Sequence, residues 1–385
     1  MAETIIVAGS LAQRPHHGGH TWVFLQYLLG FRAAGYDVVF ADWLDESMCV
    51  DEAGRPAPLH ASVNLRFLAE TMDRWGLAEC WSLLAANGEG AGIGREDLIG
   101  RARRSILLLN VMGYLNDEEI LSAAPLCAFL DIDPGFGQMW ADLGLADPFA
   151  GHDRYITVGG RIGEPGCDIP TLGLDWTHVL PSVHLSEWPA LPGHSDDRFT
   201  SVASWRGPFG PIEYGGRTYG LRVHELRRFA ALPGRAGATF ELALDIDDAD
   251  ARDRDALLRE GWVLVEPREA AGDPWRYREY IRGSAAELMV AKSLYVDTRS
   301  GWFSDRSACY LASGRPVLAQ DTGLEDLLPA GEGLLIFADL EEAAAGAEAI
   351  LADYDRHSRA ARELAEEHLA ADRVLPRLLE EIGIA

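Results

Sequence analysis

Short apolar runs alternate with longer amphipathic stretches from the start of the chain. Residues 4–9 read TIIVAG and are rich in the β-branched residues that favour strands. A loop follows, and from residue 21 to residue 34 apolar side chains recur at the spacing of one helix face. After Gly35, residues 37–43 again indicate a strand. This order predicts the opening unit of a doubly wound parallel sheet.

The same alternation continues through the first half of the chain. Further strands are expected at 105–109, 127–132 and 155–158, and helices at 63–84 and 117–123. In an open α/β sheet, ligands lie beyond the carboxyl ends of the strands. We therefore expect the loop 11–20, residues 110–114 and residues 131–137 to face one crevice.

A stretch rich in Pro, Gly, Asp and Ser interrupts the pattern at 187–200 and predicts a linker. After it, strands are expected at 199–204, 239–244, 262–265, 294–297, 316–320 and 333–337, and helices at 221–231, 251–260, 277–291, 340–354 and 358–382. We thus predict an α/β protein of two Rossmann-like, doubly wound parallel-sheet domains facing a cleft. Their expected bounds are 1–186 and 201–370, with a C-terminal helix in 371–385 that packs back on the first domain.

The most informative stretch is 299–324, RSGWFSDRSACYLASGRPVLAQDTGL. Ser304 is a good N-cap for a helix that Gly314 would end, and a buried strand follows. The free N–H groups and the dipole of such a helix start favour an anion. We predict that the diphosphate of a nucleotide binds at Ser304, Asp305 and Arg306.

Charge and cysteine content narrow the class of protein. Lys and Arg total 34 against 60 Asp and Glu, a formal net charge of -26. So acidic a chain is expected to bind neither nucleic acid nor a membrane surface. The five cysteines are scattered and form no CxxC pair, which argues against a disulfide framework and a zinc site. A cytoplasmic protein, monomeric or homodimeric, is expected.

Two motifs resemble those of glycosyltransferases of the GT-B type. Residues 307–323, SACYLASGRPVLAQDTG, resemble the donor-site pattern of these enzymes, and Gly19-His20 followed by a helix and GYDV at 35–38 resembles the Gly-His motif of natural-product glycosyltransferases. The resemblance implies an enzyme of natural-product biosynthesis. Its reaction would be the transfer of a hexose from a UDP or TDP sugar to a hydroxyl group of a small-molecule acceptor. It implies no cofactor and no metal, although DxD occurs at 131–133 and 245–247.

Two departures from the family pattern bear on the mechanism. Retaining relatives carry two glutamates seven residues apart near the donor helix, where this chain has Gly301 and Cys309. The His-Gly-Gly start of many inverting relatives is replaced by Gly301-Trp302-Phe303. We expect an inverting reaction.

Inversion requires a base for the acceptor proton, and neutral imidazole has a suitable pKa. His20 is the predicted base, with His16 and His17 as competitors. Asp131 or Asp133 is expected to hold the other ring nitrogen of His20. Acceptor contacts are expected from His17, Gly18, Gly19, Asn110 and Phe136.

Cations and amides must absorb the charge of the leaving diphosphate. Besides residues 304–306, the predicted donor contacts are Arg206, Gly207, Arg282, Lys292, Gly301, Thr322, Gly323 and Glu325. Lys292 is the only lysine of the chain, and Glu325 is expected to hold a sugar hydroxyl.

Two alternatives remain open. An NAD(P)-dependent oxidoreductase also joins two α/β domains, although the first loop lacks G-x-G-x-x-G. A catalytically inactive GT-B-like binding protein is the second alternative, favoured if His20 does not face the cleft.

Overall fold

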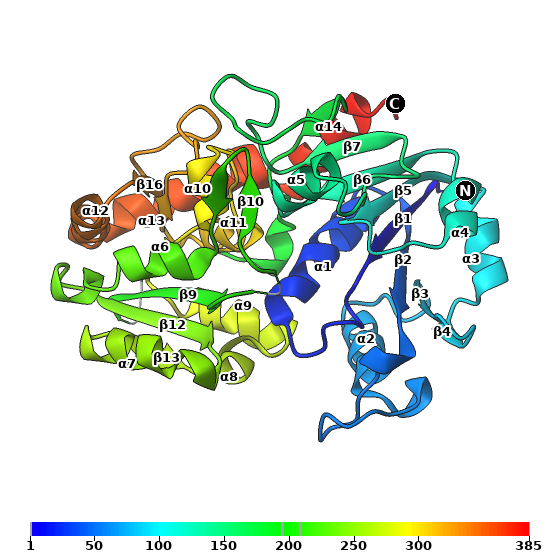
Figure 1. Ribbon diagram of the computed structural model, residues 1–385, viewed down its shortest axis with the longest axis horizontal. Helices are drawn as coiled ribbons and strands as arrows, with labels where there is room; N and C mark the ends of the chain where they lie inside the picture. The colour runs from blue at the N-terminus through cyan, green and yellow to red at the C-terminus, as the bar shows by residue number, and fades with distance from the viewer. Residues whose placement is uncertain (1, 194–195, 208, 385) are drawn as a thin grey trace.

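Two α/β domains face each other in the computed structural model, which describes residues 2–193, 196–207 and 209–384 (Figure 1). The sheet of the first domain has the order β4-β3-β2-β1-β5-β6-β7-β8 in the described residues. All neighbours are parallel except β3 and β4. The strands are β1 Thr4–Gly9, β2 Asp37–Leu44, β3 Trp81–Ala85, β4 Gly90–Gly92, β5 Ser105–Val111, β6 Cys127–Asp131, β7 Arg154–Thr157 and β8 Trp176–His178. The helices of this domain are α1 Gly18–Ala33, α2 Val63–Arg74, α3 Arg95–Ala102, α4 Glu118–Ala123 and α5 Phe136–Asp142.

The sheet of the second domain is parallel throughout, in the order β13-β12-β9-β14-β15-β16. Its strands are β9 Arg198–Ser204, β12 Thr239–Asp245, β13 Val263–Val265, β14 Ala286–Met289, β15 Val317–Gln320 and β16 Leu334–Phe337, and a separate hairpin pairs β10 Ile212–Tyr214 with β11 Arg217–Tyr219. Its helices are α6 Arg222–Arg228, α7 Ala251–Arg259, α8 Pro267–Ala271, α9 Pro274–Arg282, α10 Ser293–Asp297 and α11 Asp305–Ala312. The predicted pair of doubly wound domains is confirmed.

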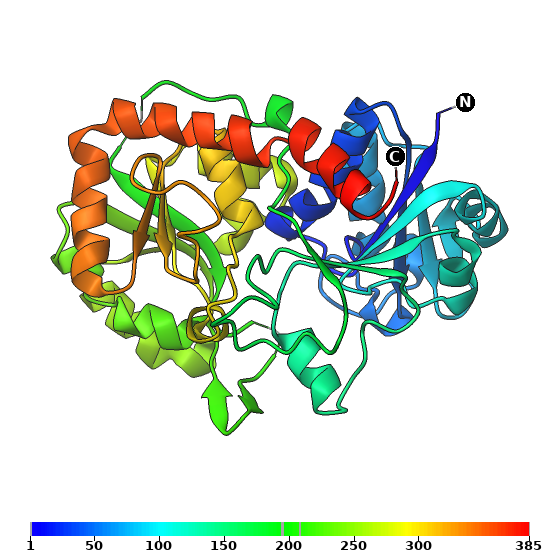
Figure 2. The ribbon, with the colours of Figure 1, turned by 90° about the horizontal axis from the view of Figure 1, so that it is seen from above.

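The chain ends in helices that return to the first domain (Figure 2). After α12 Leu340–Ala352 and α13 Tyr354–Leu364, a π-helical turn at Ala365–Leu369 leads into α14 Ala371–Glu381. Helix α14 packs on α1, where a Cβ at Gly30 would lie 2.5 Å from Leu375 Cδ1. A larger residue at position 30 would require the Leu375 side chain to shift.

Several elements differ from those expected from the sequence. The expected helix 63–84 ends at Arg74, and Gly76, in the left-handed conformation at φ 67°, leads the chain toward β3. The expected helix 277–291 is α9 followed by β14, and the expected strand 294–297 is helix α10. The four residues of β14 are all buried and three of them are apolar, and so short a run does not distinguish strand from helix.

The predicted linker 187–200 begins at the end of a 3-10 turn, Leu185–Glu187, and its described residues from 188 up to β9 are irregular; residues 194 and 195 lie outside the described residues. No helix in the described part of the chain is long and apolar enough to cross a membrane.

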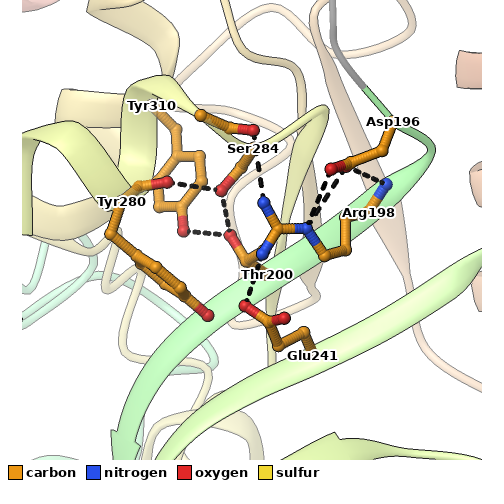
Figure 3. A network of polar contacts seen from close by, with 8 residues as sticks. Asp196, Arg198, Thr200, Glu241, Tyr280, Ser284 and Tyr310 are labelled. Atoms are coloured by element: carbon orange, nitrogen blue, oxygen red, sulfur yellow. Dashed lines mark hydrogen bonds and ion pairs between the residues drawn. The ribbon is translucent and has the colours of Figure 1, made fainter. Parts of the chain in front are cut away.

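A buried polar network fixes α11 on the second sheet (Figure 3). The Thr200 hydroxyl on β9 lies 2.6 Å from both the Ser284 and the Tyr310 hydroxyls. Ser284 also donates to the Tyr280 carbonyl, at 2.8 Å, at the end of α9. Because buried hydroxyls need partners, this network ties α11 and α9 to one strand.

Candidate functional site

A cleft of about 520 Å³ opens between the domains, with walls formed by α1 and its preceding loop on one side and strand ends of the second sheet on the other. Its lining residues from the first domain are His16, His17, Gly18, Gly19, His20, Val23 and Ile132. Those from the second domain are Val202, Ala203, Ser204, Arg222, Asp245, Glu266, Pro267, Arg268, Ala271, Tyr277, Asp305 and Arg306. The cleft thus lies where the doubly wound topology places ligands.

Four helices of the described chain have their first residue in the cleft lining, and the two longest of them are α1 and α11. Helix α11 starts at Asp305, and the Ser304 hydroxyl accepts a hydrogen bond from the Arg306 N–H at 3.2 Å, so the predicted N-cap is confirmed. Helix α1 starts at Gly18, and no side chain in the described ranges caps it. A Cβ at Gly18 would lie 2.2 Å from the Asp273 carbonyl oxygen. Glycine therefore lets α1 abut the start of α9, and both helix starts present partial positive charge to one space.

Three arginines line the same cleft, and two of them, Arg222 and Arg306, have buried nitrogens without a partner in the described residues. Arg306 donates from Nε to the buried Glu287 carboxylate at 2.5 Å and from Nη1 to the Val202 carbonyl at 3.0 Å, while its Nη2 is buried with no partner in the described residues. Arg222 has a buried Nε that likewise lacks a partner there. Burial, with a contribution from the charge of Arg306, lowers the pKa of Arg222 to about 10. Arg222 therefore still carries its charge at neutral pH.

Arg306 keeps its charge for a different reason. Burial lowers the pKa of Arg306, but the negative charge of the Glu287 carboxylate raises it by more. The pKa of Arg306 therefore lies above its ordinary value. The carboxyl of Asp305, in the same turn of α11, lines the cleft as well, and burial raises its pKa.

His20 lines the cleft, but its ring is held by Ser10. Nε2 lies 2.9 Å from the Ser10 hydroxyl and 3.2 Å from the Ser10 carbonyl oxygen. Burial, with a contribution from Arg14, lowers the pKa of His20 to about 3. The imidazole is neutral at physiological pH but a weak proton acceptor.

The aspartates expected to orient His20 have other partners, and no hydrogen bond joins either of them to His20 in the described residues. Asp131 accepts from Gln138 Nε2 at 2.7 Å and from the Thr157 hydroxyl at 3.0 Å, and burial raises its pKa to about 6. Asp133 accepts from Lys292 Nζ at 2.5 and 2.7 Å and from the Tyr295 hydroxyl. The expectation that an aspartate carboxylate bonds to the His20 ring is therefore corrected. Asp131 instead bonds to groups of its own domain, and Asp133 bonds to Lys292 and Tyr295 of the second domain.

Several expected donor contacts lie outside the cleft lining and already have partners. Arg206 forms a double hydrogen bond with Asp250 at 2.5 and 2.6 Å, and Gly207, at φ 81°, turns the chain after it. Arg282 pairs with Glu279 at 2.8 Å at the end of α9. Glu325 is exposed beside Arg299.

The expected donor glycines instead form a contact between the domains. A Cβ at Gly301 would lie 2.9 Å from the Arg161 backbone N, and one at Gly323 would lie 2.6 Å from Arg161 Cδ. Gly301 N–H donates to the Thr322 carbonyl at 2.7 Å, and the buried Thr322 hydroxyl donates to the Trp302 carbonyl. This loop packs on the first domain, and Gly301, Thr322 and Gly323 are not among the described residues that line the cleft.

Two of the expected acceptor contacts are also structural. Asn110 is buried, and its side chain closes the following turn through bonds to the Leu115 N–H and carbonyl at 3.1 and 2.8 Å. Phe136 is buried under Trp140 and Phe209. His17, Gly18 and Gly19 do line the cleft.

Arg222, Asp245, Glu266 and Arg268 line the cleft but were not among the expected site residues. Asp245 ends β12, and Glu266 follows β13 by one residue. The rule that ligands lie beyond strand ends, applied to the second domain as to the first, would have selected both. No group of three His, Cys, Asp or Glu side chains within the described ranges is placed to hold a metal ion.

Comparison with known proteins identifies the fold. No family model matches the chain, and no curated protein sequence matches it. Among solved structures, HepE of Anabaena in complex with UDP-glucose matches with a TM-score of 0.58 at 11% identity, covering 99% of this chain and all of HepE. An alpha-glucosyltransferase in complex with UDP-glucose and DNA containing an abasic site matches with a TM-score of 0.57 at 12% identity, covering the whole of both chains. The expected GT-B type of fold is confirmed.

These matches contradict the expectation of a small-molecule acceptor without nucleic acid. Further matches, with TM-scores of 0.56 and 0.54, are the alpha-glucosyltransferase with 13-mer DNA. A formal charge of -26 is a property of the whole chain, whereas recognition depends on the local field at a site. Net charge is therefore no ground for excluding nucleic acid from a protein of this fold.

Proposed function

We propose that the protein is a glycosyltransferase that moves a sugar from a nucleoside-diphosphate sugar to a hydroxyl of an acceptor. The observation that carries this proposal is the convergence of two helix starts and two guanidinium groups with unpartnered nitrogens on one interdomain cleft. Helix starts and arginines are the groups with which proteins bind phosphate.

In this proposal the diphosphate lies between the starts of α1 and α11. Arg222 would donate to its oxygens through guanidinium nitrogens other than the buried Nε, and Arg306 would contribute its positive charge from the cleft wall. As the bond to the sugar breaks, negative charge grows on the leaving diphosphate, and charges already positioned in the cleft stabilise it without reorganisation. Because these groups supply positive charge, we propose a reaction that needs no metal ion.

The remaining polar groups suit the nucleoside and the sugar. Asp245 and Glu266 lie at the ends of neighbouring strands β12 and β13. Their carboxylates line the cleft and could accept from ribose hydroxyls. Asp305, beside the proposed diphosphate site, could accept from the sugar. We propose a UDP-type donor, since HepE and the alpha-glucosyltransferase bind UDP, with TDP as the alternative.

The alternative function, that of an NAD(P)-dependent oxidoreductase, can be distinguished from a glycosyltransferase by a ligand-binding experiment. A ligand at a hundred times its dissociation constant stabilises a folded protein by about 2.7 kcal/mol, which raises the melting temperature by a few degrees for a chain of this size. We expect UDP or TDP to raise the melting temperature in a thermal-shift assay and NADH to leave it unchanged. Stabilisation by NADH alone would contradict the proposal.

A further inference from the structure

A second cavity, of about 670 Å³, lies beside the donor cleft. Its walls come from the loop 50–54 and α2 of the first domain and from residues 268–276 of the second. His16 and Arg268 line both cavities. The two cavities therefore meet at His16. If the donor fills the first, the second is a space from which a hydroxyl can approach the sugar.

His16 differs from the other two histidines of its loop. Its ring makes no hydrogen bond within the described residues and lies against the Phe67 ring, with centroids 5.8 Å apart. By contrast, His17 Nδ1 lies 3.0 Å from the Pro15 carbonyl oxygen, and His20 is held by Ser10. His16 also adopts φ 66°, an uncommon conformation for a residue with a side chain. The loop thus holds an imidazole with unengaged nitrogens at the junction of the two cavities.

We infer that the second cavity receives the acceptor and that His16, rather than His20, takes the acceptor proton. This inference rests on the proposed function. The acceptor O–H gives its proton to a ring nitrogen of His16, and the oxygen bonds to the anomeric carbon. The bond from that carbon to the diphosphate oxygen breaks, and its electron pair leaves with the diphosphate. Attack from the side opposite the leaving group inverts the anomeric centre.

The surroundings keep His16 unprotonated. Burial lowers its pKa, and so do the nearby charges of Arg268 on α8 and Arg66 on α2 and the neighbouring His17, while Glu52 of the loop 50–54 raises it. The other charged groups on the cavity wall are Asp51, Glu70, Asp273 and Arg276. The net effect is a lowered pKa, so His16 is a free base at neutral pH.

The cavity also indicates what part of an acceptor would enter. Val63 and Phe67 form an apolar wall and are 4% and 9% exposed. Charged side chains surround it, including Arg268, which has no ion-pair partner in the described part of the chain. An acceptor whose hydroxyl lies next to an apolar face fits this wall.

The experiment uses UDP-glucose as donor and water as the probe acceptor, with UDP release as the rate and calorimetry with UDP as the measure of binding. We expect His16→Gln to slow UDP release by roughly a hundredfold or more, the typical contribution of a general base, with UDP affinity close to that of the wild type. His60→Gln, at an exposed histidine outside both cavities, is the matched control and should retain the wild-type rate. A wild-type rate in His16→Gln would overturn the inference.

The pH profile gives a second readout. Because Arg268 lowers the pKa of His16, Arg268→Gln should raise that pKa and move the acidic limb of the rate profile to higher pH. An unmoved limb would mean that His16 is not the titrating base. Failure of the proposed function is distinguishable from either result, because the wild-type protein would then bind no UDP, and the inference would fall with it.

Discussion

Asp131 shows how a residue can sit at the carboxyl end of a strand and still serve structure. One oxygen accepts from Gln138 and Thr157, and the other from the Asp133 N–H at 3.1 Å. These bonds shape the turn that carries Asp133 toward Lys292. Asp131 is 1% exposed, and its burial raises its pKa from 3.8 to about 6.

The raised pKa of Asp131 predicts a pH dependence of stability. The folded protein holds the Asp131 proton more tightly than the unfolded chain, so this contribution is fully present below about pH 4 and is lost as the pH rises through about 6. In Asp131→Asn this dependence should be absent. The difference in free energy of unfolding between wild type and variant, measured with urea, should change by up to roughly 3 kcal/mol in this window. A constant difference would show that Asp131 does not titrate there.

Sequence reasoning succeeded for residues whose chemistry is local and failed for those whose partners are distant. Ser304 caps α11 as expected, because a cap bonds only to its own helix. Lys292 and Arg206 were expected to bind the donor, but each meets an aspartate far away in the sequence, Asp133 and Asp250. Arg222 showed no motif at all. Its proposed role rests on its place in the cleft wall, which only the folded structure reveals.

At the scale of elements, the start of α1 is held in place by its contact with α9. The Trp22 indole N–H donates to the Pro274 carbonyl at 2.7 Å, and Gly18 and Gly19 let the backbone approach Asp273 and Tyr277. A Cβ at Gly19 would lie 2.8 Å from the Tyr277 ring. The position of one helix start in the cleft therefore depends on two glycines.

Gly18→Ala should displace the start of α1. The added Cβ would meet the backbone carbonyl of Asp273, which cannot swing aside as a side chain could. We expect a loss of about 1–3 kcal/mol in the free energy of unfolding and weaker UDP binding. Gly100→Ala in α3 is the matched control, since the nearest atom to its Cβ would be 3.6 Å away, and it should stabilise the protein by about 0.5–1 kcal/mol. Measuring unfolding and UDP affinity for both variants would check this; equal behaviour of the two would contradict it.

Elements with a clear period were predictable, and short ones were not. The predicted strand 4–9 coincides with β1, and the strand expected at 239–244 is β12 within one residue. Helix α10 was taken for a strand because LYVD is short and partly β-branched. The edge strands β8 and β4 have three residues each, too few to show a period.

At the scale of the whole molecule, contacts on both sides of the cleft join the domains. Lys292 and Asp133 form an ion pair across the interface, and the Arg161 N–H donates to the Ser300 carbonyl at 3.1 Å. Arg278 on α9 forms an ion pair with Glu187, which precedes the second domain in the sequence. The donor motif expected at 299–324 thus has two parts: the loop and the strand end pack against the first domain, and the start of α11 faces the cleft.

The two-domain architecture followed from the alternation of strands and helices, but the identity of the acceptor did not follow from the charge. The expectation of no nucleic-acid partner came from the net charge of the whole chain, -26. The alpha-glucosyltransferase, which has the same fold, is bound to DNA. The class of acceptor therefore depends on the charge of local surfaces, which the net charge of the chain does not describe.

The most direct test of the account is the affinity for UDP of Arg222→Gln, measured by isothermal titration calorimetry. Arg222 has no ion pair in the described residues, so its loss should not leave a buried charge unmatched. A charged hydrogen bond to phosphate contributes about 1.5–3 kcal/mol, and the variant should bind UDP roughly 10- to 100-fold more weakly than the wild type. Arg259→Gln, an exposed arginine on α7, is the control and should bind as the wild type does. Equal UDP affinity of Arg222→Gln and the wild type would contradict the diphosphate site proposed in this cleft.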